Sequence, residues 1–444
     1  MNETLVAPPA SEGAFLLRAS QSLQGALARQ KGDPAWLCAR RAQAVAQVQA
    51  LGLPGPRAEA WRFTSLRALD KLAPLARIGG APALPAFAPD ALVLVLRNGR
   101  FDAQASQLRA LPPGVAVAPL ERALAEERPA ARFGELARAE GHFFNALNEA
   151  LFDGGVFLRL ESGAVLDRPL QIVHLVDPSA EALPSAHARV HVILERGASA
   201  HVLERYLGAE GASFSNPVTE LLLQEGARLG YARLQEEGPQ AIHLGRVAAR
   251  LERDAALQGL SVMWGAQLAR AEFHVELAGN GAEASIDGLY LPAEGQHHDH
   301  TLSLRHLAPH TQSRQSFRGI LAGNGRAVFR GQVYVAPGAQ KIDARQSCKN
   351  LLLSPRAWVD ALPQLEIHAD DVKCSHGATI GRLDAEALHY LRARGIGRDE
   401  ARALLTFAFA NEILSALPEE ALRSSLEAQL RSWLATHGKE TTHA

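Results

Sequence analysis

The sequence has few cysteines and no long hydrophobic run. Its 444 residues hold only Cys38, Cys348 and Cys374, odd in number and far apart, so neither a disulfide framework nor a zinc site built from paired CxxC motifs is expected. No stretch of about 18 unbroken apolar residues occurs, so no membrane-spanning helix is expected. The N-terminal segment MNETLVAPPASEGAFLL lacks the basic start and the apolar run of a secretory signal, and we therefore expect a cytoplasmic protein.

Charge of one sign is not in excess either. The 46 Lys and Arg residues nearly balance the 47 Asp and Glu residues, which gives a formal net charge of −1. The chain therefore shows no excess of positive charge of the kind that binds nucleic acid or an anionic membrane. A composition of 47% hydrophobic and 21% charged residues is typical of a soluble globular protein. We therefore expect no nucleic acid and no membrane among its partners.

The common motifs of nucleotide and hydrolase chemistry are missing. The chain has no GxxxxGK[ST] phosphate loop, no GxSxG and no HExxH. The segments GNGAEAS and GNGRAVF lack the lysine and the strand-to-helix setting of a phosphate loop, and they are interpreted as turns. We predict that the chain does not hydrolyse nucleotide by itself.

The first third of the chain has a mainly helical pattern. A helix is predicted from Asp33, which suits an N-cap, to Gly52 just past the helix end. The Asn-Gly pair at 98–99 predicts a tight hairpin turn after the strand ALVLVLR. Residues 118–155 are again helical in pattern. We therefore predict an N-terminal mainly helical region over 1–154 that contains a small β-hairpin.

Residues 155–382 form a β core in this interpretation, because helical periodicity nearly vanishes and short alternating runs replace it. The runs recur as units of strand, tight turn and strand. Their leading residues are Leu194, Leu223, Leu251, Leu277, Leu321 and Leu353, with gaps of 29, 28, 26, 44 and 32. Such a period is typical of stacked repeats and favours a β-helix, with a run of ordinary hairpins as the alternative.

Helices return in the C-terminal region, residues 383–444. Asp384 suits the N-cap of one helix that Gly395 ends, and residues 398–417 form a second helix that is apolar around most of its circumference. Its large apolar side chains are Leu404, Leu405, Phe407, Phe409 and Ile413. A helix this apolar needs cover on more than one side, either from its own domain or from a partner protein.

One segment concentrates histidine. GQHHDHTLSLRHLAPHTQS carries His297, His298, His300, His306 and His310. In a strand, His298 and His300 would face the same way, which is a workable metal spacing. A hydrogen-bonded polar ladder or a solvated loop is the alternative.

A second segment, DDVKCSHGATIG, places a thiol and an imidazole two residues apart. In a strand, Cys374 and His376 share a face with Val372, while Lys373 and Ser375 take the other. Thiolate and imidazole suit iron or zinc, yet two ligands are fewer than a closed site requires. Either another chain completes the site or the pair is structural.

These motifs carry a resemblance to a known family. The stretch DARQSCKNLLLSPRAWVDALPQLEIHADDVKCSHGATIGRLDAEALHYLRARGI resembles the C-terminal core signature of the SufB/SufD family, the scaffold subunits of the Suf iron-sulfur cluster assembly system. The resemblance extends to RAEAWRFTSL, NALNEALFDGG and EARALLTFAFANEIL. It follows the SufD branch, since LLLSPRAWVDALP lacks the cysteine that the SufB branch carries there.

The resemblance implies a fold and a set of partners. The fold is mainly β, a right-handed parallel β-helix between N-terminal and C-terminal helical regions. The function is that of an assembly scaffold, not an enzyme, that has no ATPase activity, pairs with SufB through the β-helix and binds the SufC ATPase through the helical region 383–444. The missing phosphate loop would then belong to SufC, and the apolar helix at Leu404–Ile413 would face that partner. The isolated chain could also pair with itself.

The resemblance also implies a role for the thiol and the imidazole. His376 is similar to the family histidine that ligates the nascent cluster together with SufB, and Cys374 is its neighbour in the same motif. The cluster is transient and belongs to the complex, with no cofactor in the isolated chain. A stand-alone metal-binding β-helix and a β-helix carbohydrate-processing enzyme are the alternatives. The enzyme would need clustered carboxylates, whereas Asp370 and Asp371 point to opposite faces of a strand.

Overall fold

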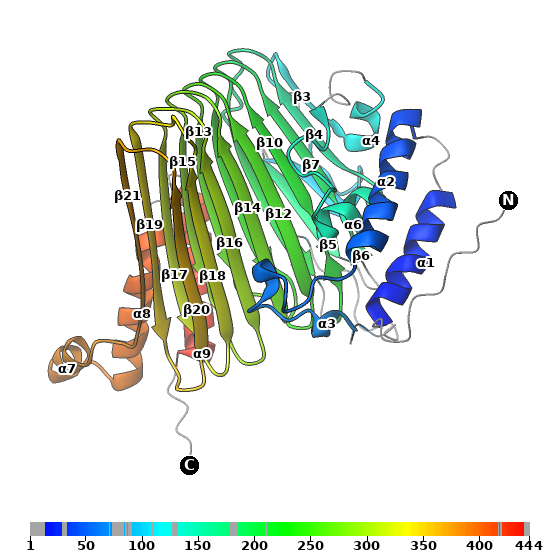
Figure 1. Ribbon diagram of the computed structural model, residues 1–444. Helices are drawn as coiled ribbons and strands as arrows, with labels where there is room; N and C mark the ends of the chain where they lie inside the picture. Colours follow the sequence, from blue (N-terminus) through cyan, green and yellow to red (C-terminus); the bar gives the residue numbers. More distant parts are fainter. Residues whose placement is uncertain are drawn as a thin grey trace.

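The chain folds into a parallel β-solenoid with helices at both ends, as Figure 1 shows. The computed structural model describes residues 14–28, 33–70, 72, 84, 87, 91–108, 111–126, 132–176, 185–208, 211–415, 417 and 420–438. Two long sheets face each other, and successive strands alternate between them. The predicted fold class, mainly β with a β-helix core and terminal helices, is confirmed.

The first sheet, called sheet A below, has ten strands. In spatial order they are β2 (Arg100–Phe101), β1 (Leu92–Arg97), β5 (Leu170–Val176), β8 (Ser199–Gly208), β11 (Arg228–Glu236), β13 (Ala256–Met263), β15 (Glu283–Tyr290), β17 (Gln312–Leu321), β19 (Ile342–Leu352) and β21 (Val372–Gly381). All neighbours pair in parallel except β1 and β2, which form the hairpin predicted at the Asn-Gly pair.

The second sheet, sheet B, lies opposite. Its main path runs through β20 (Trp358–Ile367), β18 (Arg326–Val335), β16 (His297–His306), β14 (Leu268–Leu277), β12 (Ile242–Leu251), β10 (Val218–Leu223), β7 (Arg189–Leu194), β4 (Gly155–Leu160) and β3 (Val115–Pro119). Two short strands, β6 (Ser185–Ala186) and β9 (Phe214–Ser215), pair beside β12. Only β3 runs antiparallel, against β4.

The first four leucines of the predicted repeat stack on one another in successive coils. Leu194, Leu223, Leu251 and Leu277 are register partners on successive strands of sheet B, and their side chains are buried between the sheets. The ladder then continues through His306, Val335 and Ile367. Leu321 instead ends β17 of sheet A, where it pairs with Leu352, and Leu353 directly follows β19, so the last two leucines belong to the other sheet, which explains the gap of 44 residues.

Helices from the two ends of the chain cover opposite outer faces. The N-terminal helices are α1 (Ala14–Ala28), α2 (Ala35–Leu51), the 3-10 turn η1 (Glu59–Trp61), α3 (Arg67–Asp70), α4 (Leu120–Ala123) and α6 (Phe143–Leu151). The C-terminal ones are α7 (Ala385–Ala393), α8 (Arg398–Leu414) and α9 (Glu420–His437). Side chains of α1, α2 and α6 pack against outward residues of sheet B such as Leu244, while α8 and α9 pack on sheet A around Leu260.

Two details of the N-terminal region differ from the sequence reading. Helix α2 begins after Pro34, because the carboxylate of Asp33 pairs with Arg41 instead of capping the helix. Within the stretch 118–155, α4 and α6 are helices, whereas Gly134 and Gly141 between them take left-handed backbone conformations.

The two ends of the solenoid differ in how their edges are covered. At the N-terminal end, β2 and β3 run antiparallel to their neighbours and close both sheets. At the other end, β21 pairs only with β19, and β20 pairs only with β18. The described part of the chain therefore leaves the outer backbone edges of β20 and β21 without a strand partner.

The interior is not purely apolar. Glu204 is fully buried on β8, where its carboxylate accepts hydrogen bonds from the hydroxyls of Tyr206 (2.6 Å), Thr219 (2.8 Å) and Tyr231 (2.9 Å) and lies 2.8 Å from His174 Nε2. Burial alone would raise the pKa of this carboxyl, but its bonds to His174 and to the hydroxyls lower the pKa to about 2.

Buried neutral histidines make the fold sensitive to acid. Burial lowers the pKa of His298 to about 3 and that of His306 to about 4, so both bind fewer protons in the folded chain than in the unfolded one below pH 6.5. Glu204 adds a loss of stability as the pH falls from about 4.5 toward 2. Urea unfolding at several pH values should show the free energy of unfolding dropping from pH 6.5 to 4, by about 1.4 kcal/mol per pH unit for each such histidine.

The matched variant is His298→Gln, which removes one of these groups. In this variant the free energy of unfolding should fall less steeply with decreasing pH, by the contribution of about one bound proton. The variant should also be less stable than the wild type at neutral pH. A decline of unchanged steepness in this variant would contradict the assignment of His298.

Candidate functional site

The thiol and the imidazole of the DDVKCSHGATIG segment lie on β21, the last strand of sheet A. Register places Cys374 beside Ala344 and His376 beside Gln346 of β19, and both partners point into the buried interior. Cys374 and His376 therefore share one face, as the alternation predicted, and the structure shows that this face points inward. Cys374 is half-buried, whereas His376 is exposed because, in the described part of the chain, no further coil lies over β21.

The last coil presents an incomplete interior around this pair. By register, its inward residues are Val359, Ala361, Pro363, Leu365 and Ile367 on β20, and Val372, Cys374, His376, Ala378 and Ile380 on β21. Ile367 and Ile380 are among the exposed large hydrophobic residues of the chain. The site is thus an apolar rim with one thiol and one imidazole, open toward solvent.

The other cysteine of the β core does not join this pair. Cys348 pairs with Ala378 across the ladder, four positions along the strand from Ala344, the partner of Cys374. At about 3.3 Å per residue, this offset separates the two positions by roughly 13 Å along the strand. Burial raises the pKa of Cys348 to about 11, and the thiol lies 3.5 Å from Tyr290 Oη and 3.3 Å from Asn350 Nδ2. Cys348 is an interior packing residue.

The neighbouring carboxylates occupy a turn. The side chain of Asp371 pairs with Lys341, and its backbone N–H donates to Gln340 Oε1 (2.8 Å). Asp370 precedes it outside any strand. Among the described residues, no group of three or more His, Cys, Asp or Glu side chains is placed to hold a metal ion.

The histidines at 297–310 are hydrogen-bonded residues of β16 and of the turn after it. His298 Nε2 donates to the carbonyl of Gly265 (2.8 Å), and His300 Nε2 lies 2.9 Å from Ser261 Oγ. His306 lies between the hydroxyls of Thr311 (2.8 Å) and Ser313 (2.9 Å). These contacts agree with the hydrogen-bonded polar ladder that the sequence offered as an alternative to a metal site.

The remaining two histidines of the group differ from these three. His297 Nε2 lies 3.3 Å from Thr64 Oγ1, and His310 takes a left-handed turn conformation.

The five apolar residues proposed from the sequence as a partner surface differ in exposure. Leu404 is exposed, Leu405, Phe407 and Phe409 are partly buried, and Ile413 is buried in the core beneath α8. The structure therefore places Ile413 against the chain's own solenoid. Sequence reasoning missed Tyr390, which is 56% exposed on α7.

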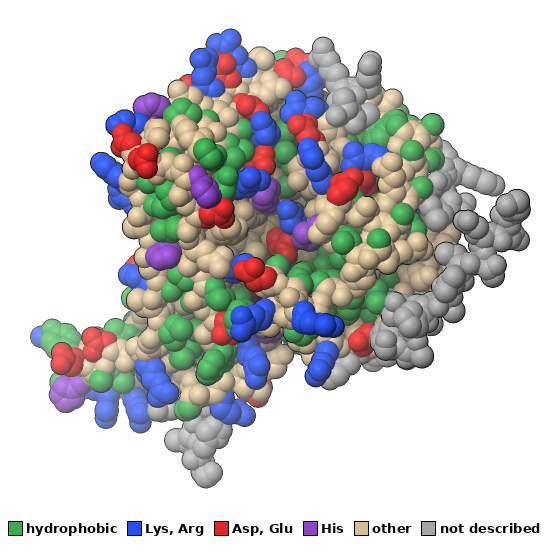
Figure 2. Space-filling view, in the orientation of Figure 1, with side chains coloured by type: hydrophobic (Ala, Val, Ile, Leu, Met, Phe, Trp, Pro, Cys, Tyr) green, Lys and Arg blue, Asp and Glu red, His purple; other side chains and the backbone are tan. Residues whose placement is uncertain are grey.

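Helix α7 projects from the body of the molecule (Figure 1) and has no buried residue. A signal for it was present in the sequence, since Leu388, Tyr390 and Leu391 are the large apolar residues of a short helix whose other residues are alanine or polar. In the same orientation, Figure 2 shows Lys, Arg, Asp and Glu side chains interspersed over this face, with no large area of one sign. That face therefore offers no charge signal of its own.

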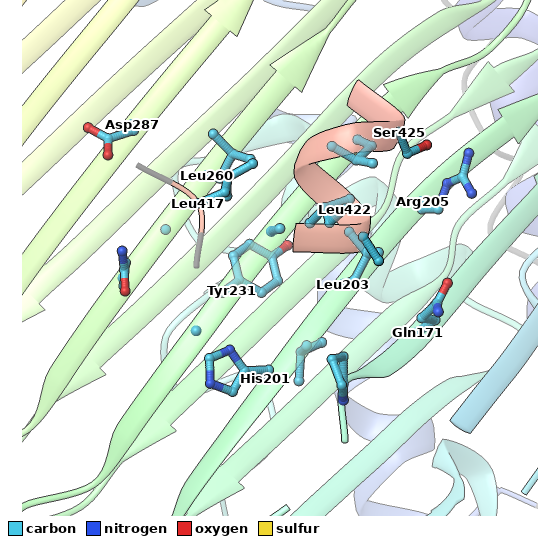
Figure 3. Close-up of a pocket in the computed structure, with 18 of the residues that line it drawn as sticks. Gln171, His201, Leu203, Arg205, Tyr231, Leu260, Asp287, Leu417, Leu422 and Ser425 are labelled. Carbon is cyan, nitrogen blue, oxygen red and sulfur yellow. The ribbon is translucent and has the colours of Figure 1, made fainter. Parts of the chain in front are cut away.

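A cavity of about 380 Å³ lies elsewhere, between the outer face of sheet A and the start of α9 (Figure 3). Leu203, Ala232 and Leu260 line its floor, and Leu417 and Leu422 line the side of the helices. None of its lining residues comes from β19, β20 or β21. The cavity is therefore separate from Cys374 and His376.

Comparison with known proteins gives the family. The family model described as SUF system FeS cluster assembly, SufBD core domain, matches residues 177–409, more than half of the chain. The chain belongs to the SufB/SufD family. This confirms the resemblance found in the motifs. The family is one of iron-sulfur cluster assembly proteins.

Relatives from several organisms share most of their length with this family member. The iron-sulfur cluster assembly protein SufD of Escherichia coli is 31% identical over 87% of this chain and 91% of its own. A SufBD family protein of Synechocystis is 30% identical over 85% of this chain and 86% of its own. SufB of Bacillus subtilis is 26% identical over 62% of this chain and 59% of its own.

No helix among the described residues is long and apolar enough to cross a membrane.

The cysteines of this SufB/SufD family member should react at very different rates. Cys374 is half-buried, and burial raises its pKa, while Cys348 is fully enclosed with a pKa of about 11. Only the thiolate is nucleophilic, so iodoacetamide should label Cys374 well before Cys348 in the folded chain, at a rate that rises between pH 8 and 10. Mass spectrometry of peptides from a time course measures both rates. Equal labelling of Cys348 and Cys374 without unfolding would contradict the placement.

Proposed function

We propose that the chain is a scaffold subunit of a Suf complex, without ATPase activity of its own, and that His376 and Cys374 provide ligands to a nascent iron-sulfur cluster. One observation carries this proposal: a pair of ligand side chains lies at the uncovered end of a parallel solenoid. Two ligands do not close a metal site, and an uncovered coil needs a neighbour. A second chain that covers this end would meet both needs at once.

The partner expected at this end is SufB. The free edges of β20 and β21 carry unpaired backbone groups that another chain's strands can extend. Similarity to SufB of Bacillus subtilis supports a homologous solenoid as that chain. The exposed Ile367 and Ile380 would then be buried by the partner. In isolation, the same surface could pair with a second copy of this chain.

The partner expected at the C-terminal helices is the SufC ATPase. Tyr390 on the projecting helix α7 and Leu404 on α8 are exposed apolar residues, and Leu405 lines a shallow hollow beside α7. Phe407 and Phe409 are half-covered by the chain itself, with Arg431 and Arg318 stacked over their rings. We therefore propose the exposed side of α7 and the first half of α8 as the surface for SufC.

A cluster under construction needs to leave again, and few, mixed ligands from two chains favour this. Movement of SufC on nucleotide hydrolysis would shift α8 relative to the solenoid. The structure offers a contact for such a shift, because Arg318 of β17 pairs with Glu412 of α8. In sheet A, β17 pairs with β19 and β19 with β21, which carries His376. We propose a cytoplasmic complex in which the cluster is transient and the isolated chain has no resident cofactor.

The ligand role of His376 is tested by His376→Ala in a complex reconstituted with SufB and SufC homologues. Since the residue is exposed, the variant should fold and bind SufC normally, yet lose nearly all cluster assembly, measured by absorbance and by maturation of an apo-ferredoxin. Ser375→Ala, on the opposite face of the same strand, is the matched control and should retain assembly. Normal maturation by the His376 variant would refute the ligand role.

The two partner surfaces are tested against each other. Tyr390→Ser with Leu404→Ser should weaken binding to the SufC homologue about tenfold or more while SufB still binds, because truncating exposed interface anchors typically costs over 1 kcal/mol each. Ile380→Asp should have the opposite effect. Affinities from surface plasmon resonance decide the matter, and loss of the same partner in both variants would contradict the assignment of two separate surfaces.

A further inference from the structure

We propose that Gln346 positions His376, by accepting a hydrogen bond from one ring nitrogen and leaving the lone pair of the other nitrogen free for the cluster. The inference rests on the ligand role proposed for His376. It assigns Gln346 as a positioning residue, which acts through His376 and does not touch the cluster itself.

The first observation is an unsatisfied amide beneath the last coil. Gln346 is only 4% exposed, and its Oε1 atom has no hydrogen-bond partner among the described residues. Its register partner on β21 is His376. Neighbouring strands lie about 4.8 Å apart, so two inward side chains at paired positions are within reach of each other.

The second observation is the direction of the amide. Gln346 Nε2 donates to Gln315 Oε1 (2.8 Å) on β17. Strand β19 lies between β17 and β21, so the nitrogen of the Gln346 amide is turned away from His376. Because the oxygen and the nitrogen of an amide diverge from their carbon, Oε1 does not point to Gln315 and is left for a partner on another strand. An acceptor therefore lies beside the position from which His376 extends.

The third observation is the space made for this amide. Gly331, on β18 of the opposite sheet, faces the interior, and a Cβ atom at this position would lie 2.1 Å from Gln346 Nε2. The lack of a side chain at Gly331 lets the Gln346 side chain reach across the interior. The residues on either side of Gly331 in the inward row, Phe329 and Val333, are buried and apolar. The polar row Gln315, Gln346 and His376 thus lies opposite a stretch of β18 whose inward side chains are apolar.

Hydrogen bonding of this kind changes what an imidazole can do. A ligating histidine generally donates its second ring N–H to a fixed acceptor, which selects the tautomer and the ring orientation. His376 is exposed at the uncovered end, so the ring is free to turn inward when another coil covers it. The contact with Gln346 would then form in the complex, where the remaining ligands are supplied.

The test uses the chain reconstituted with SufB and SufC homologues, with cluster assembly as the readout. Gln346→Leu should slow assembly about tenfold or more, the usual cost of removing the partner of a ligating histidine. Gln346→Glu keeps the acceptor, and Gln315 Nε2, which has no partner among the described residues, can donate to it. Assembly by this conservative variant should stay within about threefold of the wild type.

Tyr290→Phe is the control for loss of interior polar contacts. It removes the hydroxyl that donates to Asn350 Oδ1 (2.5 Å) and lies near Cys348, without touching the row of His376. Thermal unfolding should show this variant at least as destabilised as Gln346→Leu, yet it should assemble clusters normally. A purely structural role of Gln346 predicts that assembly follows stability in all three variants.

The outcomes separate this inference from the function on which it rests. Normal assembly by Gln346→Leu together with loss of assembly in His376→Ala would overturn the positioning role alone. Equal losses in Gln346→Leu and Gln346→Glu would also overturn it, because the acceptor would then not matter. Normal assembly by His376→Ala would overturn the ligand role and the positioning role together.

Discussion

Each coil of this solenoid is stabilised by the coils beside it. Parallel pairing in register places Leu223 between Leu194 and Leu251, and an inward side chain is fully covered only when both neighbours exist. The terminal helices cover the outer faces of the two sheets, but they cannot cover an inward row or satisfy a strand edge. That constraint makes the two ends of the molecule different. Antiparallel strands close the first coil, whereas the described chain leaves the last one with two free edges.

Position in the stack, more than residue type, decides the chemistry of a histidine in this fold. His300 and His376 both occupy inward positions of long strands. Burial holds the pKa of His300 well below its ordinary value, and the ring lies against Ser261 and Tyr290, so it has neither charge nor access to solvent. His376 has the same side chain at the end of the stack and is exposed. A ligand for a cluster that enters and leaves is therefore placed where the stack ends.

Much of the fold and part of the site could be predicted from the sequence, because both follow from short periodicities. Period two placed Cys374 and His376 on one face, and the leucine spacing revealed the stack as far as Leu277. Beyond that point the ladder positions are occupied by His306 and Val335. The next leucines in the predicted repeat therefore belong to the other sheet. Ile413 and Leu404 could not be distinguished, because an all-round apolar helix does not show which side its own chain covers. Gln346 was invisible for a related reason, since its neighbours lie about 30 residues away on other strands.

The buried amide of Gln346 near the open end connects two events: a partner covers the last coil, and the His376 ring takes a fixed orientation. A buried amide oxygen without a partner lowers the stability of the free chain, since its desolvation is not compensated. A partner that turns His376 inward removes this penalty, and only in the complex. Covering the end and fixing the imidazole then become one step, driven by the difference in contacts between the covered and uncovered states. The same coupling works in reverse: any movement that uncovers the end also releases the imidazole from its acceptor, and the cluster loses an oriented ligand at the moment at which it becomes accessible.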